Sequence, residues 1–157
     1  FDAQITWDPA LRPSPALGVT TAVIGNCGFT IAPCKPQDRD ITMRNLTQVE
    51  GMSLDVLRQG IVWDFETFPD YLARLREKGS AVNVAAYIGH SSVRTYVMGD
   101  DASARAATEP EIAQMQAIRF TPCLSTTCLS ALARGKPPRM RISISSSVLS
   151  PEPEPQQ

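Results

Sequence analysis

The sequence predicts an α/β protein with a parallel sheet, and three observations lead to this fold class. Two apolar segments, 18–26 and 81–88, have the composition of buried strands. The stretch between them, 38–78, has the periodicity of helices. Each apolar segment runs into a chemically capable residue, Cys27 after the first and His90 after the second. Strand, helical crossover and strand form a βαβ unit, so both residues are expected at the same end of a parallel sheet.

The first predicted strand ends in a glycine-flanked cysteine. Residues 19–24 are mostly β-branched and apolar, which is typical of a strand covered on both faces. Gly25 and Gly28 then interrupt the pattern, and glycine permits positive φ or a close backbone approach. We expect Asn26 and Gly28 to shape a turn that presents Cys27. In α/β folds, ligands and reacting groups lie at this end of the strands.

The segments around this strand carry their own boundary signals. Residues 1–17 are proline-rich and are expected to be an irregular connection, as is the loop over 29–36. A helical pattern begins at Asp38, and Gly51 ends it. A short helical turn follows over 53–60, with its first residue, a serine, as N-cap.

The helix before the second strand is the most clearly delimited. Thr67 is a good N-cap, Asp70 occupies the N3 position of a capping box, and Gly79 supplies the C-terminal stop. The predicted helix therefore covers 68–78. Its aromatic residues and those just before it are expected to pack in the core: Trp63, Phe65, Phe68 and Tyr71.

The last quarter of the chain differs in character. Residues 108–111 form a capping box that opens another helix, but its apolar period is lost after Arg119. We therefore divide the chain into 1–119 and a divergent, largely irregular tail over 120–157, in which 142–148 suggests one strand. The abrupt change also suggests a frameshifted or mis-spliced C-terminus, which the other two reading frames would test.

Composition narrows the function. The 157 residues are 43% hydrophobic and 20% charged, as in one globular domain. The net charge is −1 with no basic stripe, so we expect neither nucleic acid nor a membrane surface as a partner. No apolar run approaches the roughly 20 residues that span a bilayer. We also expect no signal peptide ahead of Phe1. We expect a cytoplasmic protein and an internal piece of a longer chain.

The four cysteines do not indicate a disulfide framework or a zinc ribbon, because their number and spacing fit neither. Cys34, Cys123 and Cys128 are expected to be small buried hydrophobes or free thiols. For Cys27, composition alone favours a buried structural thiol, with a functional thiol as the alternative.

Four motifs nevertheless give a specific resemblance. NCGFTIAPC, EGMSLD, WDFETFPDYL and GHSSVR occur in this order within residues 1–119. Together they resemble the N-acyl-D-amino-acid deacylases, the D-aminoacylase branch of the metal-dependent amidohydrolases. The resemblance implies a (β/α)8 barrel with zinc at the carboxyl ends of its strands. This chain would then supply two to three parallel strands and their crossover helices.

The resemblance assigns one metal ligand, Cys27, which matches the cysteine of the family's NCGF motif. The family's His-x-His pair would lie just before Phe1, and its further histidines and catalytic aspartate beyond residue 119. Asn26, His90 and Arg94 are candidates for contacts around the metal or with substrate. A guanidinium pairs well with a carboxylate, although a surface role for Arg94 is the alternative.

No catalytic residue is assigned. The carboxylates Asp2, Asp64 and Glu66 are expected to be caps or solvated surface. The implied reaction is hydrolysis of the linear amide of a small N-acyl-D-amino acid by a zinc enzyme. Since the chain has one histidine, the alternatives are a catalytically inactive fragment and a small α/β binding module.

Overall fold

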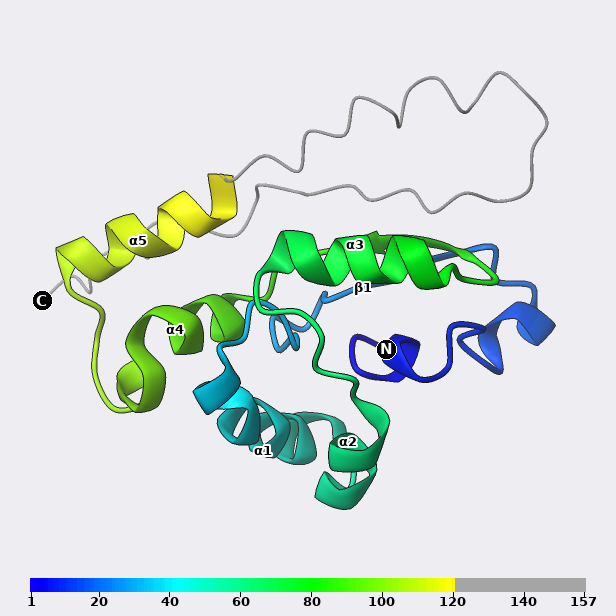
Figure 1. Ribbon diagram of the computed structural model, residues 1–157, viewed down its shortest axis with the longest axis horizontal. Coiled ribbons are helices and arrows are strands. Elements are labelled where there is room, and N and C mark those ends of the chain that lie inside the picture. The colour runs from blue at the N-terminus through cyan, green and yellow to red at the C-terminus, as the bar shows by residue number, and fades with distance from the viewer. Residues whose placement is uncertain (121–157) are drawn as a thin grey trace, which may run out of the picture.

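A computed structural model describes residues 1–120 and confirms the predicted α/β class. Two strands, β1 (Thr21–Ile24) and β2 (Asn83–Ala86), pair in parallel. Thr21 lies opposite Asn83, and Ile24 lies opposite Ala86. The crossover between them contains one short 3-10 helix and three α-helices, so the predicted βαβ unit is present (Figure 1).

The elements follow one another along the chain with short connections. In chain order they are η1 (Gln4–Thr6), η2 (Ser14–Leu17), β1, η3 (Pro36–Asp38), α1 (Arg39–Glu50), α2 (Leu54–Gly60), α3 (Phe68–Lys78), β2, α4 (His90–Met98), η4 (Gly99–Ala102) and α5 (Glu109–Phe120). The N-terminal segment, expected to be irregular, contains two short 3-10 helices. Among the described residues, no helix has the length and apolarity to cross a membrane.

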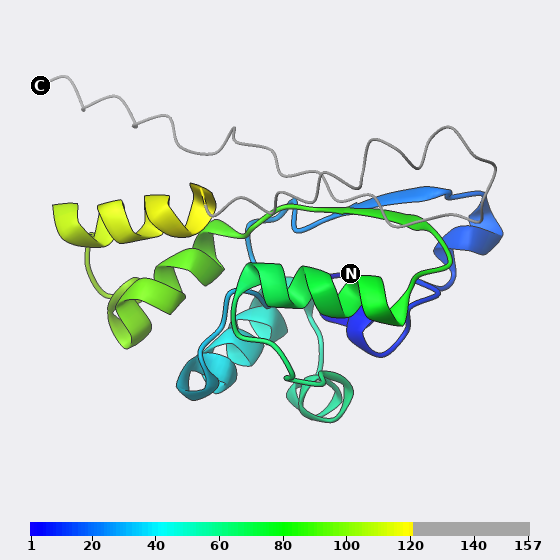
Figure 2. The same ribbon diagram turned by 45° about the horizontal axis from the view of Figure 1, so that its top comes forward.

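Helices cover one face of the strand pair within residues 1–120. Along β1, Ala22 and Ile24 are buried whereas Thr21 is exposed and Val23 is 54% exposed. In Figure 2 the strands lie along the upper side and α1, α2 and α3 lie below them. The expectation of a strand covered on both faces is therefore wrong for this structure. Apolar β-branched residues favour a strand, but they do not say how many layers pack against it.

The core lies between the sheet and the crossover. Tyr71 and Leu72 of α3 are fully buried beneath Val84 and Ile24 of the strands, together with Leu57 of α2. Phe65 and Phe68 are also buried, and Trp63 packs against the same cluster. The predicted packing role of these aromatic residues is confirmed. Burying each large apolar side chain contributes about 1.5–3 kcal/mol, which holds the crossover onto the sheet.

The capping box of α3 forms as predicted. The backbone N–H of Asp70 donates to Thr67 Oγ1 at 3.2 Å, and the backbone N–H of Thr67 donates to Asp70 Oδ2 at 3.1 Å. Gly51 ends α1 in the left-handed conformation, also as predicted. Ser53 precedes α2 in an extended conformation, but its side chain makes no capping hydrogen bond.

Helix α4 has no counterpart among the predicted elements. It starts at His90, and its buried residues Val93 and Met98 form a second, smaller cluster with Met115 of α5. The two helices lie together at one end of the described structure (Figure 1). The segment is rich in Ser, Thr and Val, which are weak helix formers, so packing rather than propensity stabilises it. The predicted strand over 142–148 and the irregular tail lie outside the described residues.

Candidate functional site

Cys27 lies on a tight turn at the carboxyl end of β1, and its side chain is exposed. Gly25 and Gly28 flank it with φ of +81° and +80°, a region that favours glycine. The Gly28 backbone N–H donates to the Gly25 carbonyl at 3.2 Å and closes the turn. The predicted presentation of Cys27 on a turn is confirmed, and the buried structural thiol that composition alone favoured is wrong, because Cys27 is exposed.

Gly25 also brings the ends of the two strands together. A Cβ atom at this position would lie 2.4 Å from the Tyr87 carbonyl oxygen. The Tyr87 backbone N–H in turn donates to the Ile24 carbonyl at 2.9 Å, one step beyond the end of β2. The turn therefore begins at a point where neither conformation nor space admits a side chain.

The side chain of Asp2 holds the start of this turn by a hydrogen bond. The residue is 8% exposed, and its Oδ2 accepts a hydrogen bond from the Gly25 backbone N–H at 3.1 Å. Burial is the main cause that raises the pKa of Asp2 above its ordinary value. The expectation of a capping or solvated Asp2 is therefore wrong. The contact joins residues 23 positions apart, and no local sequence signal announces it.

The far end of the turn is held by a buried network around Thr30 and Ser92. Ser92 Oγ donates to the Thr30 carbonyl at 2.5 Å, and the two hydroxyls lie 2.8 Å apart. Thr30 Oγ1 also accepts from the Gly89 backbone N–H at 3.1 Å. Ser91 donates its backbone N–H to the Gly28 carbonyl at 3.0 Å. The loop after β1 is thus bound to the start of α4, another feature that sequence patterns missed.

The surroundings of the Cys27 thiol disfavour its ionised form. Its Sγ lies 3.5 Å from Glu50 Oε1, at the end of α1, and 3.6 Å from the Phe29 carbonyl oxygen. Desolvation is the largest cause that raises the pKa of Cys27, and the hydrogen bond to Glu50 and the charges of Asp2 and Glu50 add to it. The thiolate is the form that binds metals, so a cation would compete at this sulfur with a proton.

Asn26 adjoins Cys27 in the sequence, and the backbone of His90 lies close to the same turn in space. His90 is the exposed first residue of α4, and its backbone nitrogen is 4.0 Å from the position of a Cβ on Gly28. Desolvation, followed by the charge of Arg94, lowers the pKa of His90 below its ordinary value. Asn26 is exposed within the turn itself. Their contacts with metal or substrate stay predictions.

Arg94 points to a structural role in the described residues. Its guanidinium donates to the Ala102 carbonyl oxygen, at 2.8 Å from Nη2, and to the Arg105 carbonyl oxygen at 3.0 Å. These bonds tie α4 to the last residue of η4 and to the segment that follows it. They favour the surface alternative over a contact with substrate carboxylate.

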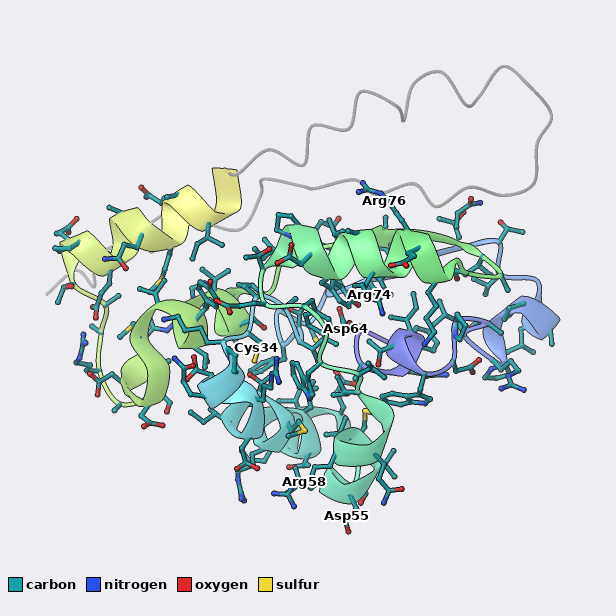
Figure 3. All side chains as sticks on the ribbon, in the orientation of Figure 1. Cys34, Asp55, Arg58, Asp64, Arg74 and Arg76 are labelled. Atoms are coloured by element: carbon teal, nitrogen blue, oxygen red, sulfur yellow. The ribbon has the colours of Figure 1, made fainter. Side chains whose placement is uncertain are left out.

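The other carboxylates behave as expected. Asp64 is exposed and forms an ion pair with Arg74 of α3, as the side chains in Figure 3 show. Glu66 is exposed and accepts from the Tyr96 hydroxyl at 3.0 Å. Cys34 is 1% exposed, so its predicted burial is confirmed. Cys123 and Cys128 lie outside the described residues.

The described residues do not complete a metal centre. Within residues 1–120, no group of three or more His, Cys, Asp or Glu side chains is placed to hold a metal ion. A hydrolytic zinc ion takes about three protein ligands and a water. The assignment of Cys27 as a metal ligand stays a prediction.

Known proteins match this chain over most of its length. It is 37% identical over 117 residues to an N-acyl-D-aspartate deacylase of Alcaligenes xylosoxydans xylosoxydans, covering 74% of this chain and 21% of the relative. A D-aminoacylase of the same organism is 41% identical over 106 residues, covering 68% and 19%. A crystal structure of D-aminoacylase matches with a TM-score of 0.55 and 36% identity, covering 74% of this chain and 22% of that one. No protein-family model matches.

The parallel βαβ unit and these matches show that the chain is similar to the amidohydrolases as a class. Within that class, it is homologous to part of the D-aminoacylases, which confirms the predicted resemblance. It spans about a fifth of the length of the curated relatives. A second D-aminoacylase structure, with a TM-score of 0.54, concerns a binuclear metal centre in that enzyme.

Proposed function

We propose that residues 1–119 are part of a (β/α)8 barrel and form one structural unit. In such barrels the helices pack outside the parallel strands, while the other strand face turns to the barrel interior. The structure supports this because α1, α2 and α3 lie on one face of the sheet and Thr21 and Val23 are exposed on the other. Two strands cannot close a barrel that needs eight, so further strands would have to complete it.

We further propose that the whole protein hydrolyses the amide bond of an N-acyl-D-amino acid. Water adds across the C–N bond and gives a carboxylate and a free D-amino acid. Support comes from the deacylase relatives at 37–41% identity. The substrate is a small molecule, and the proposed cofactor is zinc, which in such enzymes generates hydroxide and polarises the scissile carbonyl.

The observation that carries the proposal is the exposed Cys27 on its turn at the carboxyl end of β1. We propose that its thiolate supplies one zinc ligand. The remaining ligands and the catalytic groups would come from segments other than residues 1–120. A second candidate, a catalytically inactive segment, is favoured for the chain alone because the described residues hold no set of three ligands.

The test measures zinc content after dialysis and hydrolysis of N-acetyl-D-amino acids against their L-isomers. We expect the 157-residue chain to show no turnover. In the whole protein, where the other ligands are proposed to lie, we expect Cys27→Ser to lower the zinc content, whereas the control Cys34→Ala, at a buried thiol, leaves it unchanged. Equal zinc content in Cys27→Ser and the unaltered whole protein would disprove the ligand assignment. D-selective turnover by the chain alone would rule out the inactive segment.

A further inference from the structure

We infer that Asp2 is a positioning residue for Cys27: its buried carboxylate holds the start of the turn over 25–28 and so sets where the thiol lies. The inference deepens the proposed function and rests on it only for the use made of the thiol. The positioning itself is a property of the described residues. Asp2 belongs to neither strand, and within residues 1–120 no hydrogen bond joins it to Cys27, so the positioning acts through the backbone of Gly25, apart from the effect of its charge on the thiol.

The first step is the contact with Gly25. This residue directly follows β1 and stands two positions before Cys27, and its backbone N–H donates to Asp2 Oδ2 at 3.1 Å. The Tyr87 carbonyl oxygen, one residue beyond β2, lies instead 2.4 Å from the Cβ position of Gly25. Asp2 thus satisfies a buried donor that would otherwise lose its hydrogen bond.

The second step is that Asp2 is itself held in place. Tyr71 of α3, 1% exposed, donates its hydroxyl to the Asp2 carbonyl oxygen at 3.0 Å. The bond joins α3 to the N-terminal segment across 69 residues. A chain of contacts therefore runs from the core helix through Asp2 to the turn. The position of the turn is therefore fixed relative to the packed core, and not by local backbone preferences alone.

The third step is that the thiol's own contacts are long. The Cys27 side chain is exposed, and among the described residues its sulfur contacts Glu50 at 3.5 Å and the Phe29 carbonyl oxygen at 3.6 Å. The far end is bound through Thr30 and Ser92 to α4. Asp2 at the near end and Thr30 at the far end together span the loop that carries the thiol.

The experiment compares Asp2→Ala, which lacks the acceptor, with Asp2→Asn, whose amide oxygen can still accept from Gly25 while the charge is lost. Thr6→Val is the matched control, because it removes a buried hydrogen bond of the same segment, from Thr6 Oγ1 to the Ala3 carbonyl. Two readouts are made on the full chain. One is hydrogen exchange at the Gly25 amide, and the other is the rate of Cys27 alkylation by iodoacetamide, resolved by peptide mass spectrometry.

We expect about tenfold faster exchange at Gly25 in Asp2→Ala, which is the loss of one buried hydrogen bond to a charged acceptor. In Asp2→Ala, Cys27 should be alkylated several-fold faster than in Asp2→Asn. Buried Cys34 and the Tyr87 amide, bonded between the strands, should keep the rates that they have in Thr6→Val. Comparing the alanine and asparagine variants separates the hydrogen bond from the charge.

Two results would overturn the inference. One is unchanged Gly25 exchange and Cys27 alkylation in Asp2→Ala. The other is an equal rise at Cys34 and Tyr87, which means that the variant merely unfolds. Neither result bears on the zinc content of Cys27→Ser, so a failure of the positioning role and a failure of the proposed ligand are told apart.

Discussion

At the scale of single residues, Gly25 is where the fold and the candidate site meet. It directly follows the strand, begins the turn that carries Cys27, and donates its backbone N–H to the Asp2 carboxylate. Its φ of +81° and its lack of space both require glycine. The sequence predicts that this glycine permits a turn or a close approach, and the structure uses both.

We expect Gly25→Ala to lower the free energy of unfolding by about 2–4 kcal/mol, since it adds both left-handed strain and a steric overlap. Gly51→Ala is the matched control: its φ is also positive, at +65°, in the left-handed region, but nothing lies within 4 Å of the added Cβ. That variant should lose only about 1–2 kcal/mol, the cost of the left-handed conformation. Urea denaturation measures both. Equal losses would mean that the close approach to Tyr87 carries no energy.

Glu50 offers a separate test of the thiol. Because its hydrogen bond and charge help to raise the pKa of Cys27, Glu50→Gln should lower that pKa and speed alkylation at neutral pH. A pH–rate profile of Cys27 alkylation measures the shift. Asp55→Asn, at the tip of α2 (Figure 3), is the control and should leave the profile in place. A profile unmoved by Glu50→Gln would contradict the contact.

At the scale of elements, helix ends were the most predictable features. The signals of α3 act between residues at most three positions apart, so the chain forms them wherever the helix packs. Helix α4 has no side-chain hydrogen bond at its N-cap, and its buried residues cluster with α5.

For α3, Thr67→Ala should lower the free energy of unfolding by about 1 kcal/mol, because the Asp70 N–H loses its capping oxygen. Thr47→Ala in α1 is a suitable reference, as its hydroxyl bonds only to the Arg44 carbonyl within its own helix. It should be close to neutral. Thermal or urea unfolding measures both variants. An unchanged free energy of unfolding in Thr67→Ala would mean that the capping box does not stabilise the protein.

For α5, we expect the stability of the start of the helix to depend on pH through Glu111. The Arg105 guanidinium, followed by the bonds from Thr108, lowers the pKa of Glu111 to about 2. A lowered carboxyl pKa stabilises the folded state above the ordinary value near 4.5, and this support is lost as the pH falls through about 2. Glu111→Gln should therefore weaken the hydrogen-exchange protection of the Ile112 amide at pH 6. Below pH 2 variant and unaltered chain should agree; a difference that persists there would contradict the assignment.

At the scale of the whole molecule, the described residues form a one-sided layer: two parallel strands with the crossover helices on one face. This arrangement suits a portion of a larger barrel, in keeping with the fifth of the relatives' length that the chain spans. The proposed unit over 1–119 can be tested directly. A chain ending at residue 119 should retain a cooperative thermal transition near that of the full chain, followed by circular dichroism. A broad, non-cooperative loss of signal would reject the boundary.

Much of the fold could be predicted because its signals are local. The Thr67–Asp70 box, Gly51 and the glycines around Cys27 act within a few residues, and each lies where the pattern placed it. Asp2 could not be predicted, since its role depends on a contact 23 residues away. The same holds for Thr30 and Ser92, which meet across 62 residues.

The sequence by itself determined the parallel βαβ order, the helix ends and the cysteine turn, because backbone preferences and hydrophobic period act over short distances. Only the tertiary structure decided which strand face is covered, that α4 forms, and that a buried Asp2 supports the turn of Cys27. These features arise from packing between segments far apart in the chain, where a residue's surroundings rather than its type set its role.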